Sequence, residues 1–305
     1  MSERPVSSGA GPTVAARRGH LAMLAFSALV AGSFSLGAMA APHVAPEAFT
    51  AMRFTIAALG VALVMRAAGP VPRAALTAPW RYILLAGLFA GYFVTMFTGL
   101  QTAPAVSMST VFTLTPAMSA LFGWWLLGQR TTPRMALALL IGGTGALWVV
   151  FRGDLSALLA LEVGRGEAIF FVGCVAHAVY TPLLARLNRG EPALVVNTAV
   201  LGTGAILLWI WGWRAMVGTD WAALPQIVWT TLLYTAIAAT ALTFALVRFS
   251  ALRLPSAKVM AYTYLVPSWV LVWDMALGRS LPEARVLAGG ALTIVALALL
   301  LRDDG

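Results

Sequence analysis

The sequence TLTPAMSALFGWWLLGQRTTPRMALALLIGG, residues 113–143, has a weaker copy near the other end of the chain. The copy is YLVPSWVLVWDMALGRSLPEARVLAGG, residues 264–290. In both, a proline is followed by an apolar run, a Leu-Gly pair, a second proline and a Gly-Gly pair, in that order. An ordered match of this kind indicates an internal repeat, with one copy in each half of the chain.

The rest of the chain is as apolar as these two stretches. Of its 305 residues, 60% are hydrophobic and 10% are charged, and the mean hydropathy is +0.87. A soluble domain has about 25% charged residues, so this composition predicts an integral membrane protein. The net charge of +9 comes from basic residues scattered between apolar runs, which argues against a nucleic-acid partner.

Ten apolar runs are long enough to cross a bilayer, for which a helix needs about 20 residues. We expect an all-α fold of ten transmembrane helices at residues 21–41, 46–65, 82–102, 105–127, 135–151, 168–185, 193–213, 225–247, 256–277 and 284–301. The predicted domains are an N-terminal tail (1–20), a first five-helix repeat (21–151), an external linker (152–166), a second five-helix repeat (167–301) and a C-terminal tail (302–305).

The basic residues predict the orientation of these spans. With the N-terminus inside, fourteen arginines and lysines fall in the inner connections and tails and five in the outer ones, and one, Arg53, lies within a span. Because positively charged loops stay on the cytoplasmic side, both termini are predicted to be cytoplasmic, in the inner membrane of the cell. Five is an odd number, so the second repeat enters the membrane from the opposite side. Inverted repeats of this kind are typical of secondary transporters.

At this point the chain resembles the ten-helix drug/metabolite transporters, specifically the EamA-like family, over roughly residues 21–301. The resemblance lies in Pro46 followed by Arg53-Phe54, in residues 102–116, in the Leu-Leu-Gly-Gln-Arg at 126–130, in Gly166-Glu167 and in residues 178–180. It implies two inverted five-helix bundles around a central cavity, and usually the export of a small metabolite.

The sequence departs from the family at two kinds of position. Many members have glutamate after the Leu-Gly that ends the fourth and ninth helices, where this chain has Gln129 and Arg279. The tryptophan often found in the first and sixth helices is also missing, with Ala31 and His177 near its place. These departures leave the fold expectation intact, and they leave the substrate and the coupling ion open.

Ionisable groups inside a membrane are costly, so each one is a functional hypothesis. Arg53 either binds an anionic substrate group or holds the helix bundle together. Asp274, within the ninth span, is a proton-coupling site, an outer-gate partner for Arg53, or a solvated residue at the helix mouth. Lys258 either snorkels to the inner interface or forms a gate. His177 either accepts a proton or bonds a neighbouring helix, and we expect it to face the same way as Tyr180, three residues later.

The remaining candidates are hydroxyl, aromatic and proline residues. Hydroxyls at helical spacing on the fourth span either line a wet cavity or join helices. Prolines that interrupt two related spans either free carbonyls for a binding site or only shape the bundle. The glycines of the first and third spans predict close helix approach. The residues are Ser107, Thr110 and Thr113 (stripe); Pro116 and Pro267; Gly32, Gly37, Gly87 and Gly91; and, as further cavity lining, Ser33, Tyr92, Tyr234, Tyr262 and Trp269.

The sequence therefore predicts a secondary active transporter that works by alternating access. It would export a small organic metabolite such as an amino acid, or a drug, with protons as a candidate coupling ion. No cofactor, metal or nucleic acid is expected, and the chain would be a monomer or homodimer among membrane lipids. The alternatives are an integral membrane enzyme, which would need a cluster of carboxylates or histidines, and a non-transporting scaffold.

Overall fold

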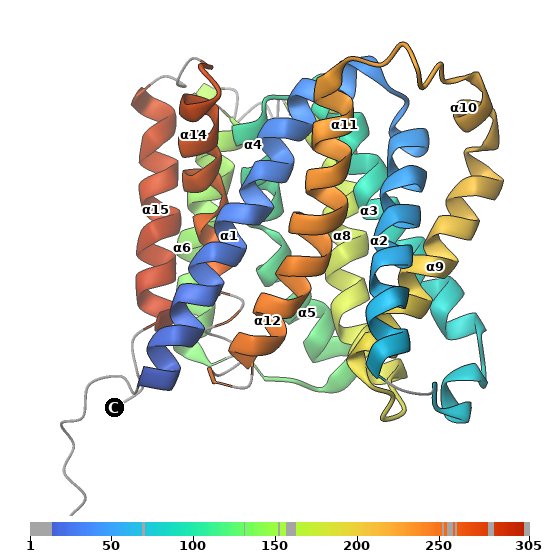
Figure 1. Ribbon diagram of the computed structural model, residues 1–305. Helices are drawn as coiled ribbons and strands as arrows, with labels where there is room; N and C mark the ends of the chain where they lie inside the picture. The colour runs from blue at the N-terminus through green and yellow to red at the C-terminus, as the bar shows by residue number, and fades with distance from the viewer. Residues whose placement is uncertain are drawn as a thin grey trace, which may run out of the picture.

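The computed structural model describes residues 14–68, 71–130, 132–151, 153–156, 163–251, 253–254, 259, 261–279 and 284–301. Every regular element in these ranges is helical, and the helices form one bundle (Figure 1). Eight helical stretches are long and apolar enough to cross a membrane, and a ninth helix, α15, has an apolar stretch at Leu287–Leu299. The protein is thus a multi-pass membrane protein. The predicted ninth span lies partly outside the described residues.

In the first half of the chain, the described residues form six long or broken helices and two short 3-10 turns. They are α1 (Val14–Ala40), η1 (Ala41–His43), α2 (Pro46–Ala68), η2 (Arg73–Leu76), α3 (Trp80–Leu100), α4 (Ala105–Phe112), α5 (Thr115–Leu127) and α6 (Pro133–Val150). Helix α1 begins at least seven residues before the predicted span. Its first turns carry exposed Arg17 and Arg18, so the helix continues past the apolar stretch.

The second half repeats this order with more interruptions. It contains α8 (Arg165–Leu187), α9 (Ala193–Trp211), α10 (Trp213–Gly218), α11 (Gln226–Leu233), η3 (Tyr234–Leu242), α12 (Thr243–Ala251), η4 (Tyr262–Leu265), α14 (Val266–Ala276) and α15 (Ala284–Leu301). Segment η3 is a π-helix, which joins α11 to α12 without leaving the helical path.

The two predicted proline interruptions are present. A break at Thr113–Leu114 separates α4 from α5, and Pro116 is the second residue of α5. The 3-10 turn η4 precedes α14, in which Pro267 is again second. Proline lacks an N–H group and is tolerated in the first turn of a helix, so both helices restart where the missing donor costs least.

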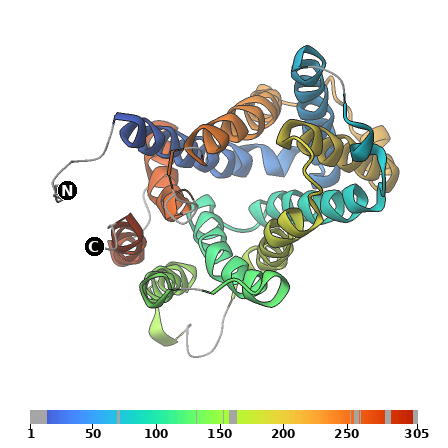
Figure 2. The same ribbon diagram turned by 90° about the horizontal axis from the view of Figure 1, so that it is seen from below.

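Most of the extensive packing joins one half of the chain to the other. Helix α3 packs against α8 and α9, α1 against α12 and α14, α2 against α9 and η3, α5 against α8, and α6 against α15. Figure 2 shows α6 and α15 together at one edge of the bundle. The halves are therefore interleaved, and the interior of the protein is built by both.

Glycines let neighbouring helices approach α1 closely, but the two predicted glycines of α3 do not have this role. A β-carbon at Gly32 would collide with the Tyr234 hydroxyl, and one at Gly37 would lie 2.9 Å from the Leu100 side chain. The prediction for Gly87 and Gly91 was wrong, because a β-carbon at either position would meet no atom within 4 Å. In α3 the close approach lies instead at Gly99, whose added β-carbon would lie 2.7 Å from the Gly166 carbonyl.

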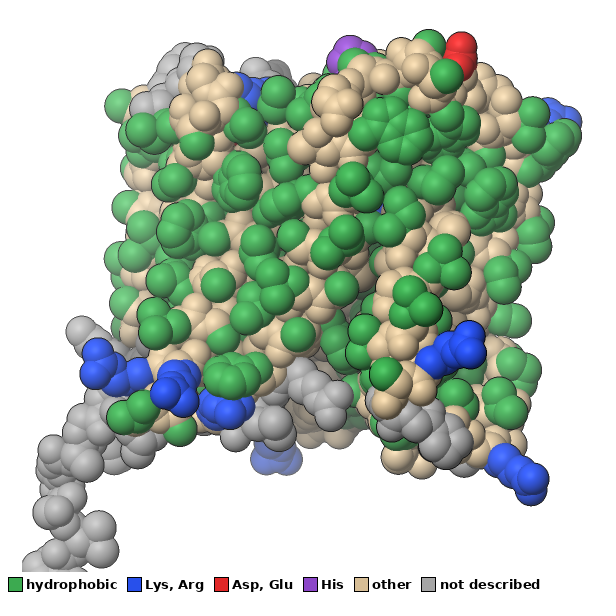
Figure 3. All heavy atoms as spheres, viewed as in Figure 1, with side chains coloured by type: hydrophobic (Ala, Val, Ile, Leu, Met, Phe, Trp, Pro, Cys, Tyr) green, Lys and Arg blue, Asp and Glu red, His purple; other side chains and the backbone are tan. Residues whose placement is uncertain are grey.

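The outer surface has the polarity that a bilayer requires. Hydrophobic side chains cover the belt of the face seen in Figure 3, and its arginines lie mainly along the lower rim, where α1 begins. Apolar residues such as Leu63, Ile210 and Trp211 are largely exposed on this surface. In water such a surface would aggregate, whereas hydrocarbon solvates it.

Candidate functional site

The candidate site is centred on Arg53, a charged side chain buried inside the bundle. Arg53 lies in α2 and is only 2% exposed. Its Nη2 donates to the Thr240 hydroxyl at 3.2 Å, and its Cζ lies 3.8 Å from the centre of the Phe93 ring. Its Nε and Nη1 have no hydrogen-bond partner among the described residues. The guanidinium therefore keeps unused donor capacity.

Thr240 accepts this bond from within the π-helix η3. Its hydroxyl donates to the Thr235 carbonyl, five residues earlier, at 2.8 Å. That bond commits the hydroxyl proton to the helix and leaves the oxygen lone pairs available to Arg53. π-Helical segments within α-helices often occur at functional sites, and this one supplies the hydroxyl that accepts a hydrogen bond from Arg53.

A chain of aromatic rings leads from Arg53 to His177. Phe93 contacts Tyr92 with ring centres 4.8 Å apart, and Tyr92 contacts His177 at 4.7 Å. His177 and Tyr180 are stacked at 6.0 Å, which confirms that they face the same way. The Nδ1 atom of His177 is buried and has no partner among the described residues. We call Arg53, Tyr92, Phe93, His177 and Thr240 the central site.

The central site combines one positive charge, unused hydrogen-bonding groups and an aromatic wall. A buried charge without a counter-ion is costly, so this arrangement favours a ligand that brings a negative group. Aromatic faces next to it suit the apolar part of the same ligand. No group of three or more His, Cys, Asp or Glu residues that could hold a metal occurs within the described ranges.

The hydroxyl stripe of the fourth span is buried and bonded to protein. Ser107 donates to Glu167 Oε1 in α8 at 2.8 Å. Thr110 donates to the Val106 carbonyl at 2.7 Å and Thr113 to the Thr110 carbonyl at 2.7 Å, both within the same helical segment. In this conformation Ser107 joins two helices, whereas the two threonines bond their own backbone.

The other predicted lining residues are distributed over the bundle. Ser33 is buried in α1, and Trp269 is half-buried against the main hydrophobic core. Tyr234 donates to the Leu29 carbonyl at 2.8 Å, so it ties η3 to α1. The Tyr262 hydroxyl lies 2.9 Å from His20 Nδ1 near the start of α1. The hydrogen bonds of Tyr234 and Tyr262 thus go to α1 and not to Arg53.

Asp274 pairs with a neighbour in sequence. The Asp274 Oδ1 lies 3.7 Å from Arg279 Nη1, and Asp274 is 7% exposed. Arg53 forms no ion pair within the part of the chain that the structure describes, so the hypothesis of an Arg53–Asp274 gate is not supported. Lys258 lies outside the described residues.

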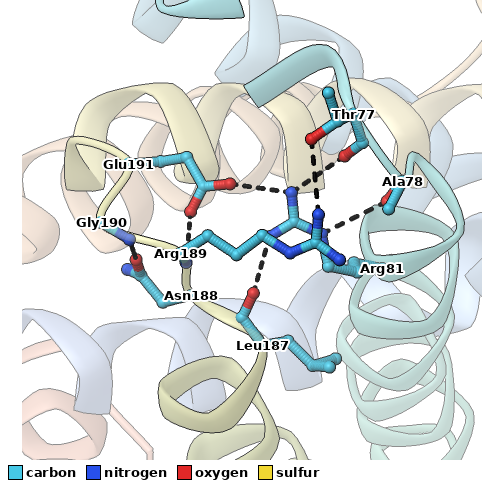
Figure 4. A network of polar contacts seen from close by, with 8 residues as sticks. All are labelled: Thr77, Ala78, Arg81, Leu187, Asn188, Arg189, Gly190 and Glu191. Atoms are coloured by element: carbon cyan, nitrogen blue, oxygen red, sulfur yellow. Dashed lines mark hydrogen bonds and ion pairs between the residues drawn. The ribbon is translucent and has the colours of Figure 1, made fainter. Parts of the chain in front are cut away.

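A second buried arginine, Arg81, was not identified as a site from the sequence (Figure 4). At the start of α3 it donates to Glu191 Oε1 at 2.8 Å and to the carbonyls of Leu187 and Thr77 at 2.6 and 3.0 Å. Its hydrogen bond lowers the pKa of the Glu191 carboxyl, which lies between α8 and α9. We call Arg81 and Glu191 the inner staple, because they join the two halves at the end of the bundle that the sequence predicts to be cytoplasmic.

The missed residues had weak signals in the sequence. Arg81 and Glu191 are 110 residues apart, so no local pattern connects them. Glu167, named from the sequence only as part of the Gly166-Glu167 motif, is 3% exposed and bonded to Ser107. Thr240 and Phe93 lie in apolar runs among many similar residues. Only packing brings Thr240 and Phe93 to Arg53.

Comparisons with known proteins agree with this architecture. A sequence model of the EamA-like transporter family matches the chain twice, at residues 17–151 and 164–302. The chain is 22% identical over 279 residues to the uncharacterized transporter YyaM of Bacillus subtilis (strain 168), covering 90% of each protein. A solved crystal structure superposes with a TM-score of 0.67 at 20% identity, covering 95% of this chain and 97% of the other, which supports the fold.

Proposed function

This chain belongs to the EamA-like transporter family, and from that premise we propose that it is a secondary transporter of a small organic anion or zwitterion. The observation that carries the proposal is Arg53, whose Nε and Nη1 lack partners among the described residues in a buried, aromatic setting. A carboxylate, such as that of an amino acid, would accept a hydrogen bond from one of these nitrogens and balance the charge. A cationic solute would be repelled at the same place.

We propose that transport proceeds by alternating access between two inverted five-helix repeats, with ten spans in all. The twofold match of the family model and the exchange of packing partners support this arrangement. Helix α3 packs on α8 and α9. Its counterpart in the second half, the segment α11–η3–α12, packs on α1 and α2 in the same way. Likewise, α5 packs on α8 and α14 packs on α1. Such an exchange is expected from a two-fold axis in the membrane plane.

The proposed orientation places both termini in the cytoplasm of a cell bounded by this inner membrane. The basic side chains along the rim where α1 begins support it (Figure 3). Helices α1 and α8 run in opposite directions in Figure 1, as inverted repeats require. Export is the proposed direction, in keeping with the family resemblance.

His177 and Asp274 are the proposed proton carriers if transport is driven by a pH gradient. His177 Nδ1 lacks a partner within the described residues, and Asp274 is buried with only a long ion pair. Asp274→Asn or His177→Ala would then abolish gradient-driven flux and preserve counterflow exchange. Unchanged driven flux in both variants would identify a facilitator or an exchanger.

Purified protein in liposomes tests the substrate class. We expect flux of an amino acid or another small carboxylate above that of empty liposomes, and none for cationic drugs. Loss of a buried charge contact costs at least about 2 kcal/mol, so Arg53→Gln would lower flux at least about 30-fold. Arg66→Gln is the matched control, because Arg66 lies in the same helix and is exposed.

Two results would contradict this assignment. Flux of a cationic drug that is unchanged in Arg53→Gln would remove Arg53 from the binding site. Failure to move or bind any solute in a broad panel would favour a non-transporting scaffold, whereas chemical conversion of a solute would favour an integral membrane enzyme.

A further inference from the structure

A groove of about 540 Å³ lies on the lipid-facing side of the bundle, between α5 and α6. None of the residues that line it belongs to the central site. Three alanines leave space between larger apolar side chains that are mostly exposed. The groove is lined chiefly by Ala117, Ala120 and Ala136 and by Leu121, Trp124 and Leu140. These positions flank the connection between the two helices, so the groove occupies the inner half of the membrane.

The groove exists because α5 and α6 follow one another in sequence but pack against different helices. Helix α5 packs along α8, whereas α6 packs along α15 (Figure 2). Gly128, with φ of +66°, ends α5, and its N–H donates to the Trp124 carbonyl at 2.9 Å while Gln129 N–H donates to Gly123 at 3.3 Å. This left-handed cap turns the chain sharply and leaves the faces of the two helices apart.

Positive charge lies at the inner end of α5, one of the two helices that line the groove. Arg130 lies in the connection between α5 and α6 and is exposed. Arg186, at the end of α8, is also exposed, and its Nη1 donates to the Leu126 carbonyl at 3.2 Å. Neither side chain forms an ion pair with any residue that the structure describes. Two guanidinium groups thus lie at the level of the lipid headgroups and can bind an anionic group.

We propose that this groove is a binding site for an anionic phospholipid. One acyl chain lies against the alanines, and the phosphate is bound by Arg130 and Arg186. Basic residues on the cytoplasmic side of membrane helices attract anionic headgroups, and an apolar groove facing hydrocarbon is filled most simply by a single chain. A second copy of the protein fits less well, because a symmetric interface needs a self-complementary surface and this one is concave.

Native mass spectrometry of the delipidated, full-length protein tests the proposal. The protein is titrated with equal amounts of phosphatidylglycerol and phosphatidylcholine that carry the same acyl chains. We expect phosphatidylglycerol to be preferred, and the preference to fall about fivefold for each arginine removed, in Arg130→Gln and in Arg130→Gln/Arg186→Gln. Arg66→Gln, an exposed arginine at the inner end of α2, is the control and keeps the preference.

A second variant tests the groove itself. Ala120→Trp fills the space and lowers retention of the lipid, while its elution in size-exclusion chromatography reports that it is folded. An equal loss of preference in Arg66→Gln would show only general attraction to a basic surface and overturn the site. Unchanged retention in folded Ala120→Trp, or a dimer that this variant abolishes, would overturn the lipid as occupant. None of these measurements depends on the transported substrate.

Discussion

Helix α3 and the segment α11–η3–α12 occupy the same place in the two halves, yet they are built differently. Helix α3 is one α-helix of 21 residues, whereas its counterpart contains nine π-helical residues. The inner staple fixes α3 to the α8–α9 connection through a buried ion pair. The counterpart is held to α1 by single hydrogen bonds from Thr231, Tyr234 and Ser250 to backbone carbonyls.

This difference separates a rigid helix from an adaptable one beside the central site. A buried, multiply bonded arginine fixes α3 strongly, whereas η3 departs from regular α-helical hydrogen bonding, as π-helical segments at functional sites often do. Arg53 contacts both, through Phe93 in α3 and Thr240 in η3. If the comparison is right, damage to α3 lowers stability most, and damage to η3 lowers transport most.

The largest effect on stability is expected from breaking the inner staple. Arg81→Gln leaves the Glu191 carboxylate buried without its ion-pair partner, which costs about 3 kcal/mol of unfolding free energy and is measured as a lower Tm. The double variant Arg81→Leu/Glu191→Leu removes both charges and should be less destabilised than the sum of its single variants. Additive losses would show that the two side chains do not act as a pair.

Gly32 tests the close packing of α1 against η3. Gly32→Ala places a methyl group where the Tyr234 hydroxyl lies and breaks its bond to Leu29, at a cost of about 1–3 kcal/mol. Gly87→Ala in α3 is the matched control, because its new methyl group meets no atom within 4 Å. There we expect an unchanged or higher Tm, since alanine favours helix by up to about 1 kcal/mol. Equal losses of Tm in both variants would show that α1 is no more closely packed at Gly32 than α3 is at Gly87.

Thr240→Val tests whether the π-helix serves Arg53. It removes the hydroxyl that accepts from Arg53 and donates to Thr235, and it leaves a further buried donor unpaired at about 1–3 kcal/mol. We expect a raised KM in liposome flux, and a fall in Tm that is smaller than that of Arg81→Gln. Thr144→Val is the control, because its exposed hydroxyl bonds only the Leu140 carbonyl of its own helix. A KM unchanged in both variants would separate η3 from substrate binding.

The smallest effect is a pH dependence of the inner staple. Because the pKa of Glu191 is lowered in the folded protein, its stabilising contribution is complete above the ordinary value of 4.5. It is lost as the pH falls from there through the lowered pKa. The Tm of the wild type should therefore drop more than that of Glu191→Gln between pH 6 and pH 3.5. Parallel decreases would assign the acid sensitivity to other groups.

Much of the fold could be predicted because membrane helices obey strong local rules. Apolar length located the spans, proline located the breaks before Thr115 and Val266, and helical spacing placed His177 beside Tyr180. The central site was predicted only in part. Arg53, Tyr92 and His177 were identifiable as polar groups within apolar runs, whereas Phe93 and Thr240 gave no comparable signal.

The sequence alone determined that this protein lies in a membrane, that its chain repeats, and that few charges enter the bilayer. These properties follow from composition and local order, because hydrocarbon requires about 20 apolar residues per span and penalises every unpaired charge. Only the tertiary structure decided which groups meet. It paired Asp274 with Arg279, Arg81 with Glu191 and Arg53 with Thr240, since partners as distant as 187 residues are selected by helix packing.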